Sequence, residues 1–354
     1  MNRFFVKYYY WFLLLVTIAA ASCSSTKSVP QGDALYTGAS VTAVKDTFTN
    51  QKNKTVRKQL EGLTRPRPNK KFLSMPFKIC MYNLAGPKPG GRGIRGWLKN
   101  KVGEPPVLLS DVNLSHNAEV LKSWLENKGY FQAKILADTT VKGKKASAQY
   151  KAITGDQYHI AEIHFPEDTS AVLISKIRET IPNSLLKTDD PFDLDVIKAE
   201  RLRIDEYLKE KGFYFFNADY LLVKVDSTIG NKKVNLYVTL KPVTPDDARK
   251  VYHINDIYIY TAFNLRETSV ADTTKRNAEF YQGYWVVDRR KFYKPKLFKQ
   301  AMPFQPGDVY SRSEQNSAIN RLINLDIFKF VKNRFVVVPQ ADSSLLNAYY
   351  YLTR

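Results

Sequence analysis

The sequence is poor in the residues that most often carry catalysis or bind metals. It has two cysteines and four histidines among 354 residues. None of the histidines has the paired spacing of a zinc site, and no G-x-S-x-G motif supplies a nucleophile. The segment Gly91–Gly96 reads G-x-G-x-x-G, but no strand pattern precedes it to deliver a phosphate to a helix. We therefore expect no metal, no cofactor and no enzymatic activity.

After the amino terminus the sequence also lacks any long apolar run. Two cations, Arg3 and Lys7, precede the uncharged stretch from Tyr8 to Ser22. This stretch is shorter than the roughly 20 residues that a membrane-spanning helix needs. A charged start, a short apolar run and small residues define a secretory signal. Residues 1–22 are therefore predicted to be a signal peptide, and the rest of the chain to be exported.

Small residues from Ala20 to Ser22 stand directly before Cys23. This arrangement resembles the lipobox of bacterial lipoproteins, although leucine is commonest where Ala20 stands. The resemblance implies that Cys23 receives a diacylglycerol and becomes the first residue of the mature chain, where several acyl chains anchor a protein stably. With Cys23 acylated, Cys80 has no second thiol in the chain, so we expect no disulfide and a small buried side chain at Cys80.

Acidic residues are scarce relative to basic ones. Lysine and arginine number 54 against 34 aspartates and glutamates, which gives a net charge of +20. Such a surface attracts polyanions. Because the chain is predicted to be exported, we expect possible contact with anionic lipid headgroups and none with nucleic acid, since no RNA-binding or zinc-finger motif is present. Solvated loops that keep the protein soluble are the alternative interpretation.

Internal repetition is the main clue to architecture. The segment Tyr158–Phe165 recurs as Tyr252–Ile259, and both have the alternation of a strand. A second block occurs three times as a turn, an amphipathic helix, a stop signal and an aromatic residue that opens a strand. The three copies run from Gly103 to Phe131, from Asp189 to Tyr214 and from Pro306 to Phe328.

The three helices of this block each have an apolar stripe and recognisable ends. Their stripes are Val120, Leu121, Trp124 and Leu125 in the first, Ile197, Ile204 and Leu208 in the second, and Ala318, Leu322 and Leu325 in the third. Ser115 is predicted to cap the first helix, and Ser311 with Glu314 has the spacing of a capping box. Gly129 and Gly212 are predicted to end the first two helices, with Asp326 in the corresponding place of the third.

The order strand, helix, helix, strand, strand, with Gly-Glu-Pro-Pro before one helix and Gly-Tyr-Phe after it, resembles the polypeptide-transport-associated (POTRA) domain. Three such units behind a lipobox resemble the BamA/TamA superfamily of outer-membrane assembly proteins, and within it the TamA-like lipoproteins of Bacteroidetes-type bacteria. The resemblance covers roughly residues 34 to 354. It implies an α+β fold of three tandem POTRA domains, each a small three-stranded sheet with two helices on one face.

The resemblance also implies domain boundaries. We expect a linker at 23–33, a first POTRA domain at 34–155 with a long basic insertion, a second at 156–246, and a third at 247–354 with an insertion at about 261–299. Members of the superfamily carry a carboxy-terminal β-barrel, for which this sequence offers no alternating segments, so we expect the barrel to be absent from this chain.

In the family the strand after the second helix lies at a sheet edge, where main-chain groups can pair with an incoming strand. Carried over, the expected edges are 133–138, 218–225 and 330–336. The residues hypothesised to bind are Ala133, Ile135, Ala218, Tyr220, Leu222, Phe330 and Phe335.

These expectations favour a non-enzymatic periplasmic polypeptide-binding region of an outer-membrane assembly or translocation factor. Its partners would be unfolded outer-membrane protein clients or assembly subunits, together with outer-membrane lipid through the acylated cysteine. Ser24 stands where an inner-membrane retention signal would have aspartate, which favours the outer membrane with the domains in the periplasm. A stand-alone scaffold or adhesion lipoprotein is the alternative. An envelope hydrolase is disfavoured because no nucleophile constellation is present.

Overall fold

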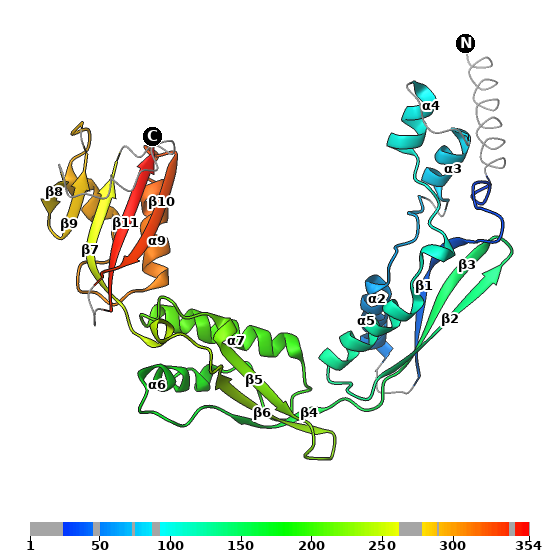
Figure 1. The fold of residues 1–354 in the computed structure, drawn as a ribbon, viewed down its shortest axis with the longest axis horizontal. Helices are drawn as coiled ribbons and strands as arrows, with labels where there is room; N and C mark the ends of the chain where they lie inside the picture. Colours follow the sequence, from blue (N-terminus) through cyan, green and yellow to red (C-terminus); the bar gives the residue numbers. More distant parts are fainter. Residues whose placement is uncertain are drawn as a thin grey trace, which may run out of the picture. The chain divides into compact units, whose positions relative to one another are not determined.

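A computed structural model of the chain describes residues 24–44, 50–72, 75–86, 93–261, 278–288, 290–339 and 344–353. The predicted signal peptide 1–22 and the predicted lipid attachment residue Cys23 lie outside the described residues. The chain divides into two compact units, Met1–Tyr158 and His159–Arg354 (Figure 1). Within the described ranges no helix combines the length and apolarity needed to cross a bilayer.

The first unit holds a three-stranded sheet in the order β1-β3-β2, with β1 parallel and β2 antiparallel to β3. Its side chains alternate, so that Ala148, Tyr150 and Ala152 of β3 are buried against the helices. Helices α2 and α5 cover this face and bury Leu60, Leu121 and Leu125 (Figure 1). The elements are β1 (Leu35–Val44), α2 (Asn50–Leu63), α5 (Leu114–Asn127), β2 (Lys134–Lys142) and β3 (Lys145–Ile153).

The basic insertion of the first unit forms helices of its own between α2 and α5. These are α3 (Phe77–Leu84), α4 (Ile94–Trp97), the π-helical turn η1 (Leu98–Val102) and the 3-10 turn η2 (Leu109–Asp111). Helix α3 packs against η1 and buries Ile79 and Cys80. Cys80 is buried as expected, but it is disulfide-bonded, so the expectation that this thiol has no partner is wrong.

The second unit begins with a three-stranded sheet in the order β4-β6-β5, which repeats the parallel and antiparallel pairing of the first sheet. Helices α6 and α7 contact each other and bury Ile177, Ile204 and Leu208. The elements are β4 (His159–His164), α6 (Val172–Arg178), η3 (Ile181–Asn183), α7 (Leu194–Glu210), η4 (Ala218–Tyr220), β5 (Leu221–Asp226), β6 (Lys233–Leu240) and η5 (Asp246–Arg249).

A further sheet in the second unit has the order β10-β11-β7-β9-β8. Strands β10, β11 and β7 repeat the three-stranded arrangement, and the insertion predicted at about 261–299 adds the hairpin β8–β9 beside β7. The elements are β7 (His253–Tyr260), β8 (Ala278–Tyr281), β9 (Tyr284–Val287), α8 (Pro295–Ala301), α9 (Arg312–Ile323), β10 (Phe330–Val337) and β11 (Leu345–Thr353). The fold is therefore α+β, with small sheets each carrying two helices.

The helix ends follow the predicted chemistry with one correction. Gly129, Gly212 and Asp326 all adopt a positive φ after their helices, as a helix stop requires. Ser311 caps α9 by accepting a hydrogen bond from the Glu314 N–H. The prediction that Ser115 caps α5 is wrong, because the cap is Asn113, two residues earlier.

Candidate polypeptide-binding edges

Each sheet ends on the strand that directly follows its second helix. Strands β2, β5 and β10 are edge strands, and each pairs with one neighbour among the described residues. An edge strand directs a row of backbone N–H and C=O groups outward, where they can pair with another strand. Among the described residues these three strands lie at sheet edges as expected, but the second edge strand begins at Leu221 and not at residue 218.

The sequence-predicted binding residues divide into two groups. Ile135 lies in β2, Leu222 in β5, and Phe330 and Phe335 in β10, whereas Ala133, Ala218 and Tyr220 precede their strands. Phe330 is 64% exposed and is available to a partner. Phe335 instead belongs to the core between the third sheet and its helices, so its side chain supports the edge from behind.

The edge strand expected from residue 218 begins only at Leu221. The side chain of Asn217 accepts a hydrogen bond from the Asp219 N–H and winds the next three residues into the turn η4. The guanidinium of Arg201 donates to the Ala218 carbonyl at 2.9 and 3.1 Å. Ala218 and Tyr220 therefore stand before the edge strand, and the carbonyl of Ala218 already has a partner.

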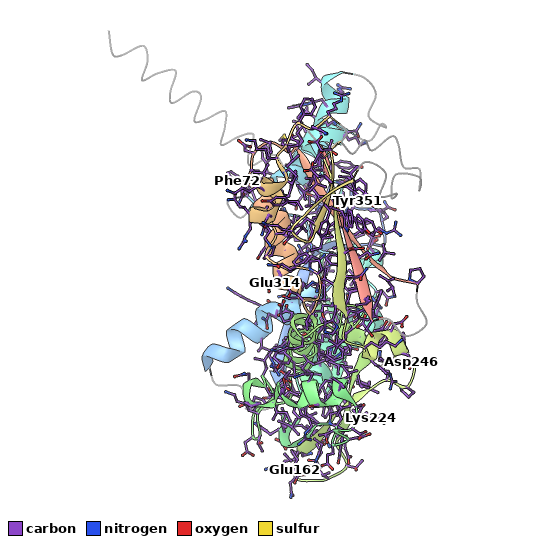
Figure 2. The ribbon with its side chains drawn as sticks, turned by 90° about the vertical axis from the view of Figure 1, so that its left-hand side faces the viewer. Phe72, Glu162, Lys224, Asp246, Glu314 and Tyr351 are labelled. Carbon is purple, nitrogen blue, oxygen red and sulfur yellow. The ribbon has the colours of Figure 1, made fainter. Side chains whose placement is uncertain are left out.

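Exposed cations follow these edges. Lys134 and Lys142 lie on β2, Lys224 lies on β5 (Figure 2), and Lys332 and Arg334 lie on β10. Lysine on an edge strand discourages uncontrolled pairing between sheets, because two such edges repel each other. Because β2 also carries Asp138 and β5 also carries Asp226, only β10 has cations without a carboxylate on the same strand.

The first strand of every sheet is crossed at its start by the segment that leads into the second helix. Isolated antiparallel bridges join Leu35 to Leu108, His159 to Pro191 and His253 to Val309. In the second sheet, for example, the Ile160 N–H donates to Asp190 O, and the Asp189 N–H donates to Ile160 O. The bridges cover the beginning of each first strand.

Beyond these bridges the equivalent strands β4 and β7 differ. The repeated segments align Ile163 with Ile257 and Phe165 with Ile259. At Ile257–Tyr260, β7 pairs in parallel with β9, and the side chains of Tyr284 and Val286 of β9 are buried in the core. Within the part of the chain that the structure describes, no strand pairs with the corresponding edge of β4.

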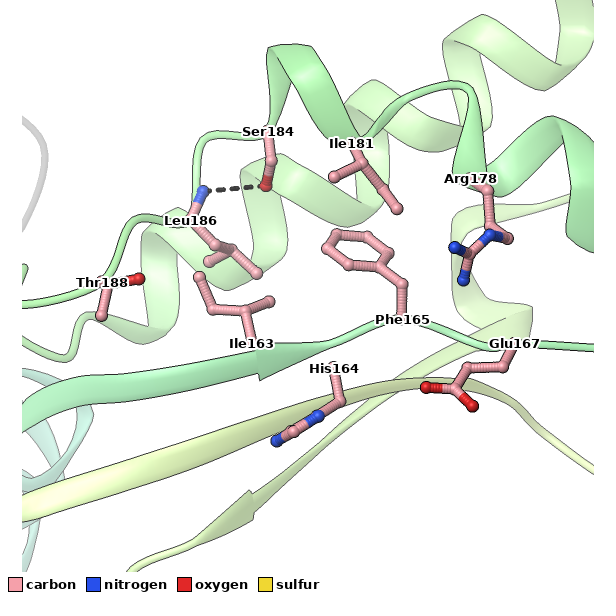
Figure 3. A pocket seen from close by; sticks show the side chains of 9 residues that line it. All are labelled: Ile163, His164, Phe165, Glu167, Arg178, Ile181, Ser184, Leu186 and Thr188. Carbon is pink, nitrogen blue, oxygen red and sulfur yellow. Dashed lines mark hydrogen bonds between the residues drawn. The ribbon is translucent and has the colours of Figure 1, made fainter.

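A cavity of about 390 Å³ lies beside this edge of β4 (Figure 3). Figure 3 shows Ile163 of β4 pointing toward Leu186 and Phe165, just past the end of β4, pointing toward Ile181, while His164 points to the other side. The guanidinium of Arg178, at the rim, donates to the Pro166 carbonyl at 3.1 Å. The lining is mixed: four apolar side chains face polar and charged ones, and most of the exposed surface of the cavity is polar.

A buried carboxylate holds the wall of this cavity in place. Glu200 of α7 accepts hydrogen bonds from the Ser184 hydroxyl at 2.9 Å and from the Leu185 N–H at 3.0 Å. The guanidinium of Arg203 donates to it at 2.6 and 2.8 Å. Burial by itself raises the pKa of Glu200, but these hydrogen bonds outweigh burial and lower the pKa below its ordinary value. The sequence does not single out the cavity residues or Glu200. The only sequence signal is the spacing of three residues between Glu200 and Arg203, which allows an ion pair on one helix face.

Comparison with known proteins gave similar structures only. No family model and no curated protein matches the chain. A crystal structure of POTRA domains 3–5 of Haemophilus influenzae BamA is 13% identical, with a TM-score of 0.41, and the match covers 92% of this chain and 100% of that one. POTRA domains 1–3 of Anabaena Omp85 are 12% identical, with a TM-score of 0.28, and the match covers 91% and 96%.

The amino-terminal domain of Omp85 from Thermosynechococcus elongatus is 10% identical, with a TM-score of 0.27, and the match covers 92% of this chain and 98% of that one. Identities and scores this low do not assign the chain to a family.

Proposed function

We propose that the chain is a non-enzymatic, periplasmic POTRA-type region of an outer-membrane protein assembly or translocation factor of the BamA/TamA superfamily, closest to its TamA-like lipoproteins. It binds extended polypeptides by adding them as strands to its sheet edges. The order of repeated sequence blocks supports this proposal, and so does the repeated β-α-α-β-β connectivity of the described sheets. The proposed domains are 34–155, 156–246 and 247–354, after a signal peptide and a linker.

One observation carries the binding proposal. Two equivalent strand edges differ in that β7 holds the added strand β9, while the matching edge of β4 has none among the described residues and borders a cavity. Strand β9 buries Tyr284 and Val286 in the core as it pairs. A client strand on β4 would place such a side chain in the cavity between Ile163 and Leu186 and gain main-chain hydrogen bonds that do not depend on its sequence.

The experiment uses a peptide copied from residues 283–288, which contain β9, and a photoreactive amino acid at position 164. We expect crosslinking of this peptide and strong loss of crosslinking with a version that carries proline at the second and fourth positions. Ile181→Lys should weaken the crosslink several-fold by charging the cavity, whereas Ile229→Lys, in the β5–β6 turn, should not. Circular dichroism establishes that both variants are folded.

Crosslinkers at positions 222 and 330 test the edges of β5 and β10 in the same way. Crosslinking there and not at position 164 would move the binding site to those edges and keep the proposed function. Absence of crosslinking at all three positions, with both the peptide and an unfolded outer-membrane protein, would overturn it.

Anchoring through Cys23 is a separate part of the proposal. It is supported by the sequence before Cys23 and by the charged start of the chain. Because the sequence contains only two cysteines, a lipid on Cys23 and the disulfide of Cys80 are alternatives within one molecule. The two states differ in mass and in their response to reduction, so they can be separated by experiment.

A further inference from the structure

The insertion that carries α3 and α4 exposes an unusual set of apolar side chains. Of the 24 large apolar side chains exposed among the described residues, six fall within the short stretch from residue 72 to residue 97. They are Phe72, Met75, Phe77, Leu84, Ile94 and Trp97. Ile94 is 79% exposed, Leu84 is 70% exposed and Trp97 is 58% exposed. A concentration of this kind marks an interaction surface.

Both helices of the insertion carry exposed apolar side chains. Phe77 and Leu84 are seven residues apart on α3 and share one face, while Ile79 and Cys80 of the same helix are buried. Ile94 and Trp97 are three residues apart on α4, which continues into η1, and η1 packs against α3. Helix α3 is thus apolar on the face that it buries and on the face that it exposes.

The charge of the insertion is of one sign. Between Glu61 and Glu104 the sequence has ten lysines and arginines and no aspartate or glutamate. The described cations Lys71 and Arg95 are exposed, and the side chain of Lys78 is 53% exposed. Cations with long aliphatic stems beside exposed aromatic and aliphatic residues are the composition of segments that lie at a lipid–water interface.

The insertion is fixed to the beginning of the mature chain. The side-chain amide of Asn83 in α3 donates to the carbonyl of Ser24 at 2.9 Å, and the Ser28 hydroxyl donates to the same side chain. Val29 packs against Ile79 of α3 in a small core. Ser24, Ser28 and Val29 are therefore held against α3 in the structure in which Cys80 is disulfide-bonded.

We propose that the exposed face of α3 and α4 is a membrane-docking surface for anionic phospholipid. The exposed residues Phe77, Leu84, Ile94 and Trp97 enter the interface, and the cations of the insertion bind the phosphate groups. The choice of a membrane as the occupant rests on the anchoring part of the proposed function and on the one-sided charge, since cations are attracted to an anionic lipid surface. The surface orients the first sheet relative to the bilayer, which an acyl chain alone does not do.

The test uses residues 23–354 produced without the signal peptide, so that no acyl chain is attached and both cysteines are kept. We expect it to float with vesicles of phosphatidylglycerol and phosphatidylethanolamine, and to bind phosphatidylcholine vesicles at least tenfold more weakly. Ile94→Gln with Trp97→Gln should lower the partition coefficient at least tenfold. The matched control is Leu202→Gln with Val243→Gln, two residues of the second unit that are exposed to the same extent as Trp97 and Ile94, and it should bind as the parent does.

Two double variants that replace lysine or arginine with glutamate complete the experiment. Lys71→Glu with Arg95→Glu should abolish flotation, whereas Lys187→Glu with Lys296→Glu makes the same change in net charge elsewhere and should retain most of it. Equal binding by all variants, or no binding by the parent at 0.1 M salt, would overturn the proposal. A parent that dimerises by light scattering and becomes monomeric with Ile94→Gln and Trp97→Gln would assign the surface to a second copy instead. None of these outcomes depends on peptide crosslinking at position 164, so failure of the membrane proposal can be distinguished from failure of the polypeptide-binding proposal.

Discussion

The carboxylate of Glu210, the last residue of α7, accepts a 2.6 Å hydrogen bond from the hydroxyl of Ser311, the residue that caps α9. It also accepts from the N–H and the hydroxyl of Ser313, at 2.9 and 2.7 Å. A negative charge at a helix amino terminus is favourable, because the N–H groups there lack partners within the helix. The helices of two successive sheets in the second unit are thus joined end to end.

Glu210→Ala should loosen this joint. We expect a loss of about 1 kcal/mol, since the group is exposed, and a fall in melting temperature of roughly 2–4 °C for the second unit. Hydrogen exchange should quicken in the first turn of α9. Glu206→Ala, on an exposed position of α7, is the control, and a fall of the same size there would show that helix propensity and not the joint is responsible.

Gly212 should tolerate no side chain. Its φ is +94°, and an added Cβ would lie 2.6 Å from a methyl carbon of Val251 and 2.8 Å from one of Val309. Gly212→Ala therefore combines backbone strain of about 1–2 kcal/mol with a steric clash. Gly230 has a φ of +84° with nothing within 4 Å of the added atom, so Gly230→Ala isolates the backbone strain. Urea denaturation should show Gly212→Ala to be clearly the less stable, and equal midpoints would contradict the packing described here.

Glu200 should make the stability of the second unit depend on acidity. Its folded pKa is lowered, so the stability that it contributes is present above its unfolded pKa of about 4.3 and is lost as the pH falls through the folded pKa. Glu200→Gln should cost several kcal/mol at pH 7, because Arg203 loses its buried partner, and the deficit should shrink at acidic pH. Urea midpoints from pH 3 to pH 7 measure both effects. Glu206→Gln should leave the profile unchanged, and a constant deficit across the range would speak against a charged Glu200.

Lipid attachment predicts a simple labelling pattern. In a bacterial host fed radioactive palmitate, the parent chain and Cys80→Ser should be labelled and partition into detergent, whereas Cys23→Ser should be unlabelled. Label that persists in Cys23→Ser would refute acylation at this position. An unlabelled parent whose mobility changes on reduction would mean that the disulfide of Cys80 takes the place of the lipid.

Much of the fold could be predicted because its signals are local. The stripes containing Leu121, Ile204 and Leu322 repeat at the helical period, and each of these residues is buried. Positive φ at Gly129, Gly212 and Asp326 follows from the need to reverse the chain after a helix. The cap of α5 was placed wrongly at Ser115 because Asn113 is an equally good cap, and composition alone does not choose between them.

The rest depends on contacts between distant residues. Strands β8 and β9 have four residues each, too few for a clear alternation, and their position beside β7 is set by pairing along the sheet. The sequences of β4 and β7 are similar, at residues 158–165 and 252–259. No local signal therefore shows that the edge of β7 pairs with β9 while the edge of β4 borders a cavity. The exposed apolar face of α3 could not be predicted for the same reason, because the sequence does not show which of its apolar residues are buried in the core.

The stretch from residue 62 to residue 103 contains no aspartate, glutamate or histidine. Its ten positive charges belong to lysine and arginine, and histidine, the residue type that changes charge between pH 5 and 8, is absent. The attraction of this insertion for a phosphate-rich layer would therefore stay constant through acidification of the surroundings. Ionic strength and the share of charged lipid would be the variables that control it, with screening acting over a Debye length of about 8 Å under physiological salt.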